Sequence, residues 1–421
     1  MSSVPYTETS SGEEETLYFI NGTIGTPPRS VRLHIDTGSS DLWVNTPSSD
    51  LCSESSKPCD FGGTYKANSS STYEYVGSWF NISYVDGSGA AGDYVSDTVT
   101  FGPATLKRLQ FGIGYESTNS QGILGIGYPI NEVQVGRAGL QPYRNLPAQM
   151  VADGMIQSNA YSLWLNDLDA NTGNILFGGI DTEKFEGSLQ TLPIQPEQGF
   201  FAEFLITLTG LELGGQPLSN DLALAVLLDT GSSLTYLPDD MVQLVYNQVN
   251  AQYDSSNGAA YVPCSLKTQN TALRFTFSGA PIEVDMNEMV LDMYTSSGRR
   301  PTFSNGQTAC LFGIAPAGQG TNVLGDTFLR SAYVVYDLAN NEISIAQTNF
   351  NSTTSKIVEI GTGANSVPSA TKVSNPVAAT AGVSTVSSLN GIGTQNAGVT
   401  TGAGVFGVTV AAVVVGFFLG L

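Results

Sequence analysis

The chain contains the sequence Asp-Thr-Gly-Ser-Ser twice, at residues 36–40 and 229–233, and these residues are the best suited to chemistry. If Asp36 and Asp229 face each other at hydrogen-bonding distance, they cannot both ionise cheaply, so they share one proton and titrate as a unit. Such a pair offers a general acid and a general base together. The serine of each copy is placed to hydrogen-bond the carboxylate, and the glycine allows close backbone approach. These supporting residues are Gly38, Ser39, Gly231 and Ser232.

The composition argues against other kinds of catalysis. The chain has a single histidine, His34, so a metal site with two or more histidine ligands cannot form, and a serine or cysteine nucleophile would have only this base. We interpret His34 as packed or exposed scaffold. No glycine-rich phosphate loop occurs, and we expect no metal and no cofactor. A net charge of −21 argues against binding to nucleic acid.

Each aspartate stands within a longer internal repeat. Residues 31–44, VRLHIDTGSSDLWV, resemble residues 225–238, AVLLDTGSSLTYLP, and GILGIG at 122–127 resembles NVLGDTF at 322–328. The two spacings are similar, 89 residues from Asp36 to Gly125 and 96 residues from Asp229 to Gly325. A single Asp-Thr-Gly would be read as a polar turn, whereas two matched copies indicate two homologous lobes.

The elements around these repeats predict an all-β fold. Residues 15–350 consist of short β-branched and aromatic runs separated by Gly, Pro, Asn and Asp. Two minor helices are expected, at 147–156 and at 238–253, the second with Pro238 at its start. We assign residues 1–15 to a polar N-terminal segment, 16–190 to an N-terminal lobe and 191–350 to a C-terminal lobe.

Residues 16–350 resemble the pepsin-like aspartic proteases. The resemblance rests on YFINGTIGTPP at 18–28, both DTGSS sequences, ILFGGID at 175–181 and VLGDTFLRSAYVVYDLANNEISIA at 323–346. It implies a bilobal fold with a cleft between the lobes, in which Asp36 and Asp229 hold a water molecule. The ionised aspartate takes a proton from this water while the protonated one polarises the scissile carbonyl, and the activity is expected at acidic pH. The family is normally made as a zymogen.

The resemblance also identifies residues 80–99 as the hairpin flap that closes the cleft. Tyr84 matches the flap tyrosine, which hydrogen-bonds an indole, here that of Trp43; the alternative for both is ordinary strand packing. Asp86 lies at the tip, where it either forms the turn before Gly87 or contacts a basic substrate side chain, as in relatives that accept such residues. We therefore expect Lys or Arg to be tolerated or preferred at P1, the residue before the scissile bond.

The cysteines and glycosylation sequons favour secretion. Four cysteines allow three pairings, and proximity favours Cys52–Cys59 with Cys264–Cys310. Four Asn-x-Ser/Thr sequons occur, at Asn21, Asn68, Asn81 and Asn351. The polar N-terminus is no signal peptide, so either the leader is not part of this sequence, the start is truncated, or the protein is cytosolic.

The C-terminal composition indicates a cell-surface anchor. Residues 351–404 are rich in Ser, Thr, Gly, Ala and Val and predict a flexible stalk, and residues 405–421 form an apolar tail. Small residues, a short spacer and a terminal apolar tail are typical of a GPI-attachment signal, with Asn396 or Asn390 as the attachment residue. The alternative is a tail-anchored membrane helix. The acidic body with this tail looks most like the fungal yapsin-type, GPI-anchored subgroup.

These features predict a monomeric, GPI-anchored aspartic endopeptidase on the outer face of the plasma membrane or in the cell wall, acting on proteins or peptides. Two other functions remain open. One is a catalytically silent binding protein with the same cleft, which the intact Asp36, Asp229 and Tyr84 argue against. The other is a structural wall protein whose stalk is the functional part.

Overall fold

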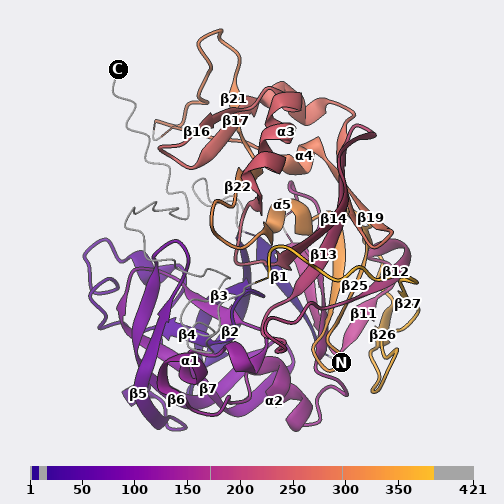
Figure 1. Cartoon of the computed structure of the whole chain (residues 1–421). Coiled ribbons are helices and arrows are strands. Elements are labelled where there is room, and N and C mark those ends of the chain that lie inside the picture. Colours follow the sequence, from indigo (N-terminus) through magenta and orange to yellow (C-terminus); the bar gives the residue numbers. More distant parts are fainter. Residues whose placement is uncertain (1, 9–16, 171, 296, 384–421) are drawn as a thin grey trace.

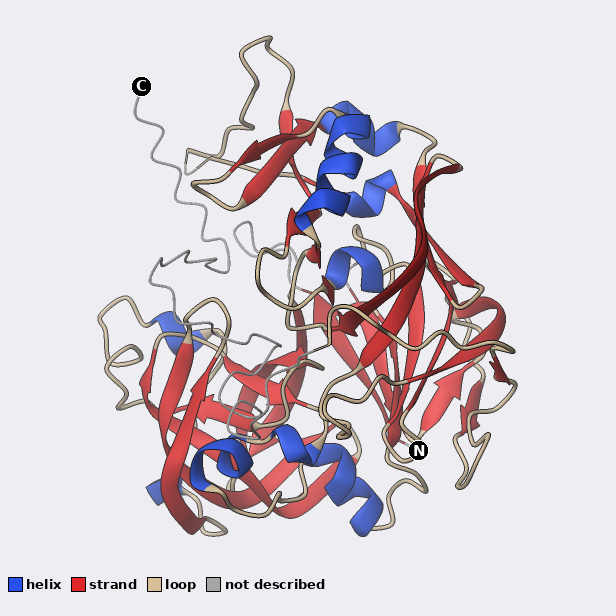
Figure 2. Cartoon of the chain, in the orientation of Figure 1, coloured by secondary structure: helices blue, strands red, loops and turns tan. Residues whose placement is uncertain are grey.

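The computed structural model of the chain describes residues 2–8, 17–170, 172–295 and 297–383. Strands dominate both lobes, and the few helices are short and lie around the sheets (Figure 2). Figure 1 shows most of the first half of the chain in one lobe and most of the second half in the other. The predicted bilobal, all-β fold is therefore confirmed.

The N-terminal lobe is built on seven strands. They are β2 (Tyr18–Ile24), β3 (Arg29–Asp36), β4 (Leu42–Asn45), β5 (Glu74–Ser83), β6 (Gly89–Phe101), β7 (Ala104–Ser117) and β8 (Gly122–Gly125). Strand β3 pairs antiparallel with β2 and parallel with β8. Its side chains alternate so that Val31, Leu33 and Ile35 enter the core, which fixes its register because a one-residue slip would expose all three.

A sheet shared by both halves of the chain joins the lobes. Its strands run in the order β12 (Phe185–Pro193), β25 (Glu342–Thr348), β24 (Ala332–Asp337), β9 (Ala160–Trp164), β10 (Thr172–Phe177) and β1 (Ser2–Glu8). Strand β1 also pairs with β2, which joins this sheet to the N-terminal lobe. The lobe boundary predicted after residue 190 thus falls inside β12, which pairs with β25 from the end of the fold. Residues 2–8 of the predicted polar segment form a strand, because backbone pairing with β10 requires no apolar run.

The C-terminal lobe contains a seven-stranded and a four-stranded sheet. The larger sheet comprises β13 (Leu205–Leu213), β14 (Gln216–Leu228), β15 (Thr235–Leu237), β18 (Ala272–Phe277), β19 (Ala280–Asp285), β22 (Ile314–Pro316) and β23 (Val323–Leu324). The smaller comprises β16 (Gln252–Asp254), β17 (Ala259–Pro263), β20 (Val290–Leu291) and β21 (Ala309–Phe312). As β3 does with β8, β14 pairs in parallel with β23, so the sequence repeat is also a structural one.

Both predicted helices are present. They are α2 (Leu146–Ala152) and α3 (Asp239–Val249), the latter preceded by Pro238. Three short helices were not predicted from the sequence: α1 (Val133–Ala138), α4 (Met286–Met289) and α5 (Asp326–Leu329). The two predicted disulfides, Cys52–Cys59 and Cys264–Cys310, are both formed.

Residues 351–383 are not a flexible stalk, contrary to the composition-based prediction for residues 351–404. Strand β26 (Ile357–Glu359) pairs with β11 (Gly179–Asp181), and β27 (Thr371–Lys372) adds to β12. Ile360 and Val367 are buried, 0% and 6% exposed, in a core cluster of the body. We call residues 351–383 the C-terminal strap; Figure 1 shows its strands against the shared sheet. The composition misled because the contacts that hold the strap are short and scattered: a few apolar side chains, brief backbone pairing, and hydrogen bonds such as those of Ser355 to Asp181 and Ser366 to Asp337.

The remaining stalk, residues 384–404, the apolar tail and the candidate attachment residues Asn390 and Asn396 lie outside the described residues. In the part of the chain that the structure describes, no helix has the length and hydrophobicity needed to span a bilayer.

Candidate active site

The two repeated aspartates lie at equivalent strand ends. Asp36 is the last residue of β3 and pairs with Gly125 of β8. Asp229 follows directly after β14, and its amide donates to the Leu324 carbonyl of β23, 3.2 Å away. A parallel neighbour strand therefore fixes each aspartate, and the two lobes contribute one each.

The hydrogen bonds around the two carboxylates are equivalent. The Gly38 amide donates to Asp36 Oδ1 and the Gly231 amide to Asp229 Oδ1, both at 2.8 Å. Ser39 Oγ donates to Asp36 Oδ2. Ser232 Oγ donates to Asp229 Oδ2 at 2.7 Å. The predicted supporting residues thus orient each carboxylate through one backbone and one side-chain donor, which also favours the ionised form.

The two glycines are required by the approach of the opposite aspartate. A Cβ on Gly38 would lie 2.5 Å from Asp229 Oδ1, and a Cβ on Gly231 would lie 2.5 Å from Asp36 Oδ1. Neither glycine is among the residues with positive φ. Glycine is therefore needed at both positions because the opposite aspartate approaches closely, as expected from the sequence, and not because of an unusual backbone conformation.

Two threonines lock the aspartate loops together across the lobes. The Thr37 amide donates to Thr230 Oγ1 at 3.1 Å, and the Thr230 amide donates to Thr37 Oγ1 at 3.0 Å. Each hydroxyl also donates across the interface, Thr37 to the Leu228 carbonyl and Thr230 to the Ile35 carbonyl, at 2.9 and 2.8 Å. Sequence reasoning did not assign these threonines, although their repetition in both copies was a signal.

The environment of the carboxylates favours a single shared proton. Asp36 is 3% exposed and Asp229 is 0% exposed. Burial raises the pKa of both, and for Asp229 burial and the charge of Asp36 raise the pKa to about 7. A hydrogen bond between the two carboxyls lowers the pKa of Asp36 and raises that of Asp229. The pair therefore keeps one shared proton, so that the protonated carboxyl can act as the acid and the ionised one as the base.

The flap is the hairpin of β5 and β6. Trp43 Nε1 donates to Tyr84 Oη at 2.7 Å, as the resemblance implied. Burial and then the charge of Asp36 raise the pKa of Tyr84, which places the tyrosine near the aspartate pair. At the tip, Gly87 has a φ of 82°, a conformation that favours glycine. Asp86 Oδ1 accepts the Ser88 amide at 2.8 Å, so Asp86 does form the turn.

A buried acidic cluster behind the flap was missed by sequence reasoning. Asp41 Oδ1 accepts the hydroxyls of Tyr94 and Tyr143, at 2.5 and 2.8 Å, and Oδ2 accepts the Val133 amide at 2.8 Å. Glu132 Oε2 accepts the Tyr143 amide at 2.7 Å. Burial and then the charge of Asp41 raise the pKa of Glu132 to about 11. The cluster holds Tyr143 beside the group that contains Trp43 and Tyr84.

The remaining candidate residues are the single histidine, the possible metal ligands and the sequon asparagines. His34 is 7% exposed and its Nε2 lies 3.0 Å from the Thr230 carbonyl oxygen, which agrees with a packed scaffold role. Among the described residues, the one group of possible metal ligands is Cys264, Asp292 and Cys310, whose sulfurs are joined in a disulfide. All four sequon asparagines are exposed: Asn21, Asn68, Asn81 and Asn351.

Comparisons with known proteins also indicate an aspartic protease. The family described as "Eukaryotic aspartyl protease" matches residues 17–348. The "Probable aspartic-type endopeptidase opsB" of Aspergillus oryzae is 59% identical over 86% of this chain and 75% of its own. "Aspartic proteinase 3" of Saccharomyces cerevisiae is 32% identical over 87% and 75%. The crystal structure of the aspartic proteinase from Irpex lacteus superposes with a TM-score of 0.66 at 22% identity, covering 84% of this chain and 99% of that one.

A bilobal β fold with one buried aspartate from each lobe defines an aspartic-type peptide hydrolase. The chain belongs to the eukaryotic aspartyl proteases, the pepsin-like family, and is an aspartic endopeptidase.

Proposed function

We propose that this endopeptidase is secreted, held at the cell surface by a GPI anchor as in the yapsin-type subgroup, and cleaves after basic residues at acidic pH. The buried aspartate pair supports the acid optimum. The ionised carboxylate of the pair would take a proton from a water molecule held between Asp36 and Asp229, while the protonated carboxyl would donate a hydrogen bond to the scissile carbonyl. Because the pKa of Asp229 is raised to about 7, we expect activity to fall as the pH rises through this value and the pair loses its shared proton.

The position of Asp86 carries the proposed specificity. Burial and then the charges of Asp229 and Asp86 raise the pKa of Tyr236 to about 12. The carboxylate at the flap tip therefore influences the same tyrosine of the C-terminal lobe as the catalytic Asp229 does. Asp86 is only partly buried, and no lysine or arginine of the described residues is ion-paired with it. A Lys or Arg side chain in the cleft would therefore find an unneutralised carboxylate at the flap.

Substitution of Asp86 tests the specificity. In Asp86→Asn we expect kcat/KM for a Lys-P1 peptide to fall about fivefold relative to a matched Leu-P1 peptide, the size of one partly exposed ion pair. Asp93→Asn, on β6 of the same hairpin, is the control and should leave the ratio unchanged. An unaltered Lys/Leu ratio in Asp86→Asn would exclude this residue as the determinant.

Surface anchoring is tested on the full chain, expressed behind a secretion signal. A GPI anchor predicts release of the protein from membranes by phosphatidylinositol-specific phospholipase C, and loss of that release in Asn396→Gln or Asn390→Gln. Protein that resists both this enzyme and carbonate extraction would instead be held by a transmembrane tail.

The exposed sequons and two disulfides support an extracellular location, since both modifications belong to the secretory route. We expect a monomer.

A further inference from the structure

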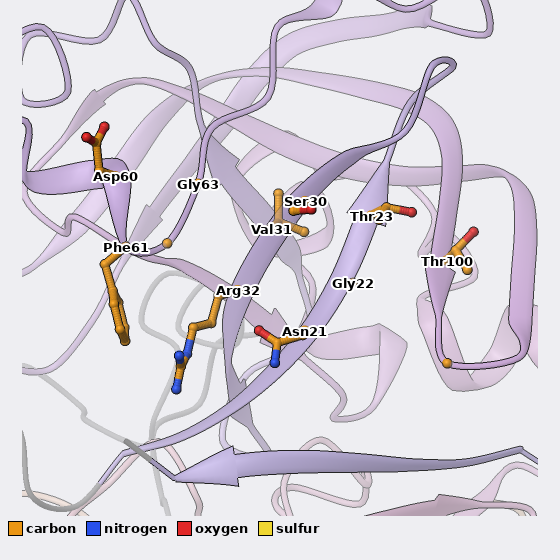
Figure 3. A pocket seen from close by; sticks show the side chains of 12 residues that line it. Asn21, Gly22, Thr23, Ser30, Val31, Arg32, Asp60, Phe61, Gly63 and Thr100 are labelled. Atoms are coloured by element: carbon orange, nitrogen blue, oxygen red, sulfur yellow. The ribbon is translucent and has the colours of Figure 1, made fainter. Parts of the chain in front are cut away.

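The hairpin that carries Asp36 also forms one side of a groove on the N-terminal lobe (Figure 3). Its volume is about 530 Å³, within the range of roughly 300–1,000 Å³ typical of small-molecule sites. The polar and aromatic side chains that matter here are Asn21, Thr23, Ser30, Arg32, Asp60 and Phe61.

The sequon at Asn21 faces this groove. Asn21 of β2 is paired with Arg32 of β3, and Thr23 is paired with Ser30, so all four side chains lie on one face of the hairpin. The intervening Gly22 lies on the opposite, core-facing side, where a Cβ would come within 2.5 Å of the Phe101 ring. Both sequon residues that an oligosaccharyltransferase reads therefore line the groove.

The groove offers groups suited to a sugar. The guanidinium of Arg32 lies 4.4 Å from the centroid of the Phe61 ring and 5.1 Å from that of Phe19. Arg32 Nε and Nη2 are buried and have no hydrogen-bond partner among the described residues. Phe61 is 41% exposed, and Figure 3 shows it beside Arg32, with Asn21 on the other side of Arg32. An exposed ring can stack against the apolar face of a pyranose, and the unpaired Arg32 donors would gain partners if the side chain turned toward the hydroxyls of the sugar.

We propose that this groove is the seat of the first sugars of an N-linked glycan on Asn21, held by stacking on Phe61 and by hydrogen bonds to Arg32. The inference rests on the proposed secretion of the chain. It separates Asn21 from the other exposed sequons, because Asn68, Asn81 and Asn351 do not line the groove.

A protection experiment tests the seat. The full chain is secreted from a fungal host and digested under native conditions with endoglycosidase H in the presence of pepstatin, and each sequon is followed by glycopeptide mass spectrometry. We expect the Asn21 glycan to be trimmed at least about tenfold more slowly than the Asn81 glycan, as for a group released only by local opening. Phe61→Ala and Arg32→Gln should each remove most of this protection. Tyr75→Ala, which removes another exposed ring, is the control and should keep it.

The other outcomes would contradict the proposed glycan site. Trimming at Asn21 as fast as at Asn81, or protection that persists in both groove variants, would overturn the seat. An unmodified Asn21 beside occupied Asn68 and Asn81 would overturn it while leaving secretion intact. If no sequon is occupied, the secretion proposal fails and the seat with it, and pepstatin-sensitive cleavage by the same sample shows separately whether the protease is sound.

Discussion

At the scale of single residues, the active site is a set of short contacts made in duplicate. Each aspartate accepts a glycine amide and a serine hydroxyl of its own loop and lies against the glycine of the other loop. The duplication explains why the sequence alone was informative here. A residue that must be Gly or Ser for steric or hydrogen-bonding reasons appears twice at the same spacing.

Gly231→Ala should inactivate the enzyme. The added Cβ would lie 2.5 Å from Asp36 Oδ1, so the carboxylates must separate and the shared proton is lost. We expect kcat to fall by at least about 100-fold, comparable to the loss of general acid–base catalysis. Gly361→Ala is the matched control, since nothing lies within 4 Å of its Cβ position. A Gly231→Ala enzyme with near-normal kcat would contradict the observed approach of the two loops.

At the scale of elements, the threonine exchange joins two strand ends from different lobes. Thr230 is 1% exposed, and its hydroxyl serves both the Thr37 amide and the Ile35 carbonyl. Neither interaction was evident from the sequence, because 193 or more residues separate the partners in the chain. The same holds for the Asp41 cluster, whose tyrosine and amide partners lie 53 to 102 residues away.

Thr230→Val should destabilise the protein more than Thr230→Ser. Valine preserves the shape but leaves two buried backbone groups unpaired, at a cost of roughly 2–4 kcal/mol. Serine retains the hydroxyl and loses one methyl, at about 1 kcal/mol. Urea unfolding measures the difference. Equal free energies of unfolding for the two variants would show that the hydrogen bonds of the Thr230 hydroxyl make no net contribution to stability.

At the scale of the whole molecule, the fold extends beyond the region that matches the family. That match ends at residue 348, whereas the strap continues to residue 383 and contributes strands to two sheets. The strap's composition resembles a linker, and no periodicity marks Ile360 or Val367 as buried. The lobes could be predicted because they repeat in the sequence. The strap could not, because it occurs once and the residues that hold it are scattered along it without a period.

A chain that ends at residue 350 should therefore be less stable than one that ends at residue 383. Removing two buried aliphatic side chains loses roughly 3–6 kcal/mol of burial, partly offset by chain entropy, so we expect Tm to fall by about 5 °C or more. Within β26 and the residue after it, Ile360→Ala should reproduce part of the loss. Ile357→Ala, at a side chain 40% exposed, should not. Equal Tm values for the two chain lengths would mean that the strap is only loosely attached.

The buried carboxyls should also make the folded protein most stable in acid. Burial raises the pKa of Asp229 to about 7 and that of Glu132 to about 11, well above their ordinary values of 3.8 and 4.5. A carboxyl that binds its proton more tightly in the folded state contributes stability that is complete below its unfolded pKa and is lost as the pH rises toward its folded pKa. The free energy of unfolding therefore falls as the pH rises from about 4 to 7 because of Asp229, and it falls from about pH 4.5 upward because of Glu132. The net charge of −21 adds repulsion over the same range.

Scanning calorimetry from pH 4 to 8 checks this expectation. Tm should be highest near the acid end and fall toward pH 8, and Glu132→Gln should reduce the fall because the amide cannot ionise. Glu116→Gln, at an exposed position, should leave the slope nearly as it is. One group acts in the opposite sense: although burial opposes it, hydrogen bonds from Ser70, Thr72 and Tyr65 lower the pKa of Asp97, so its contribution is lost below about pH 4. A Tm that rises toward pH 8, or a Glu132→Gln slope equal to that of the wild type, would show that Glu132 is ionised in the folded protein and that the acidic cluster behind the flap is stabilised by other means.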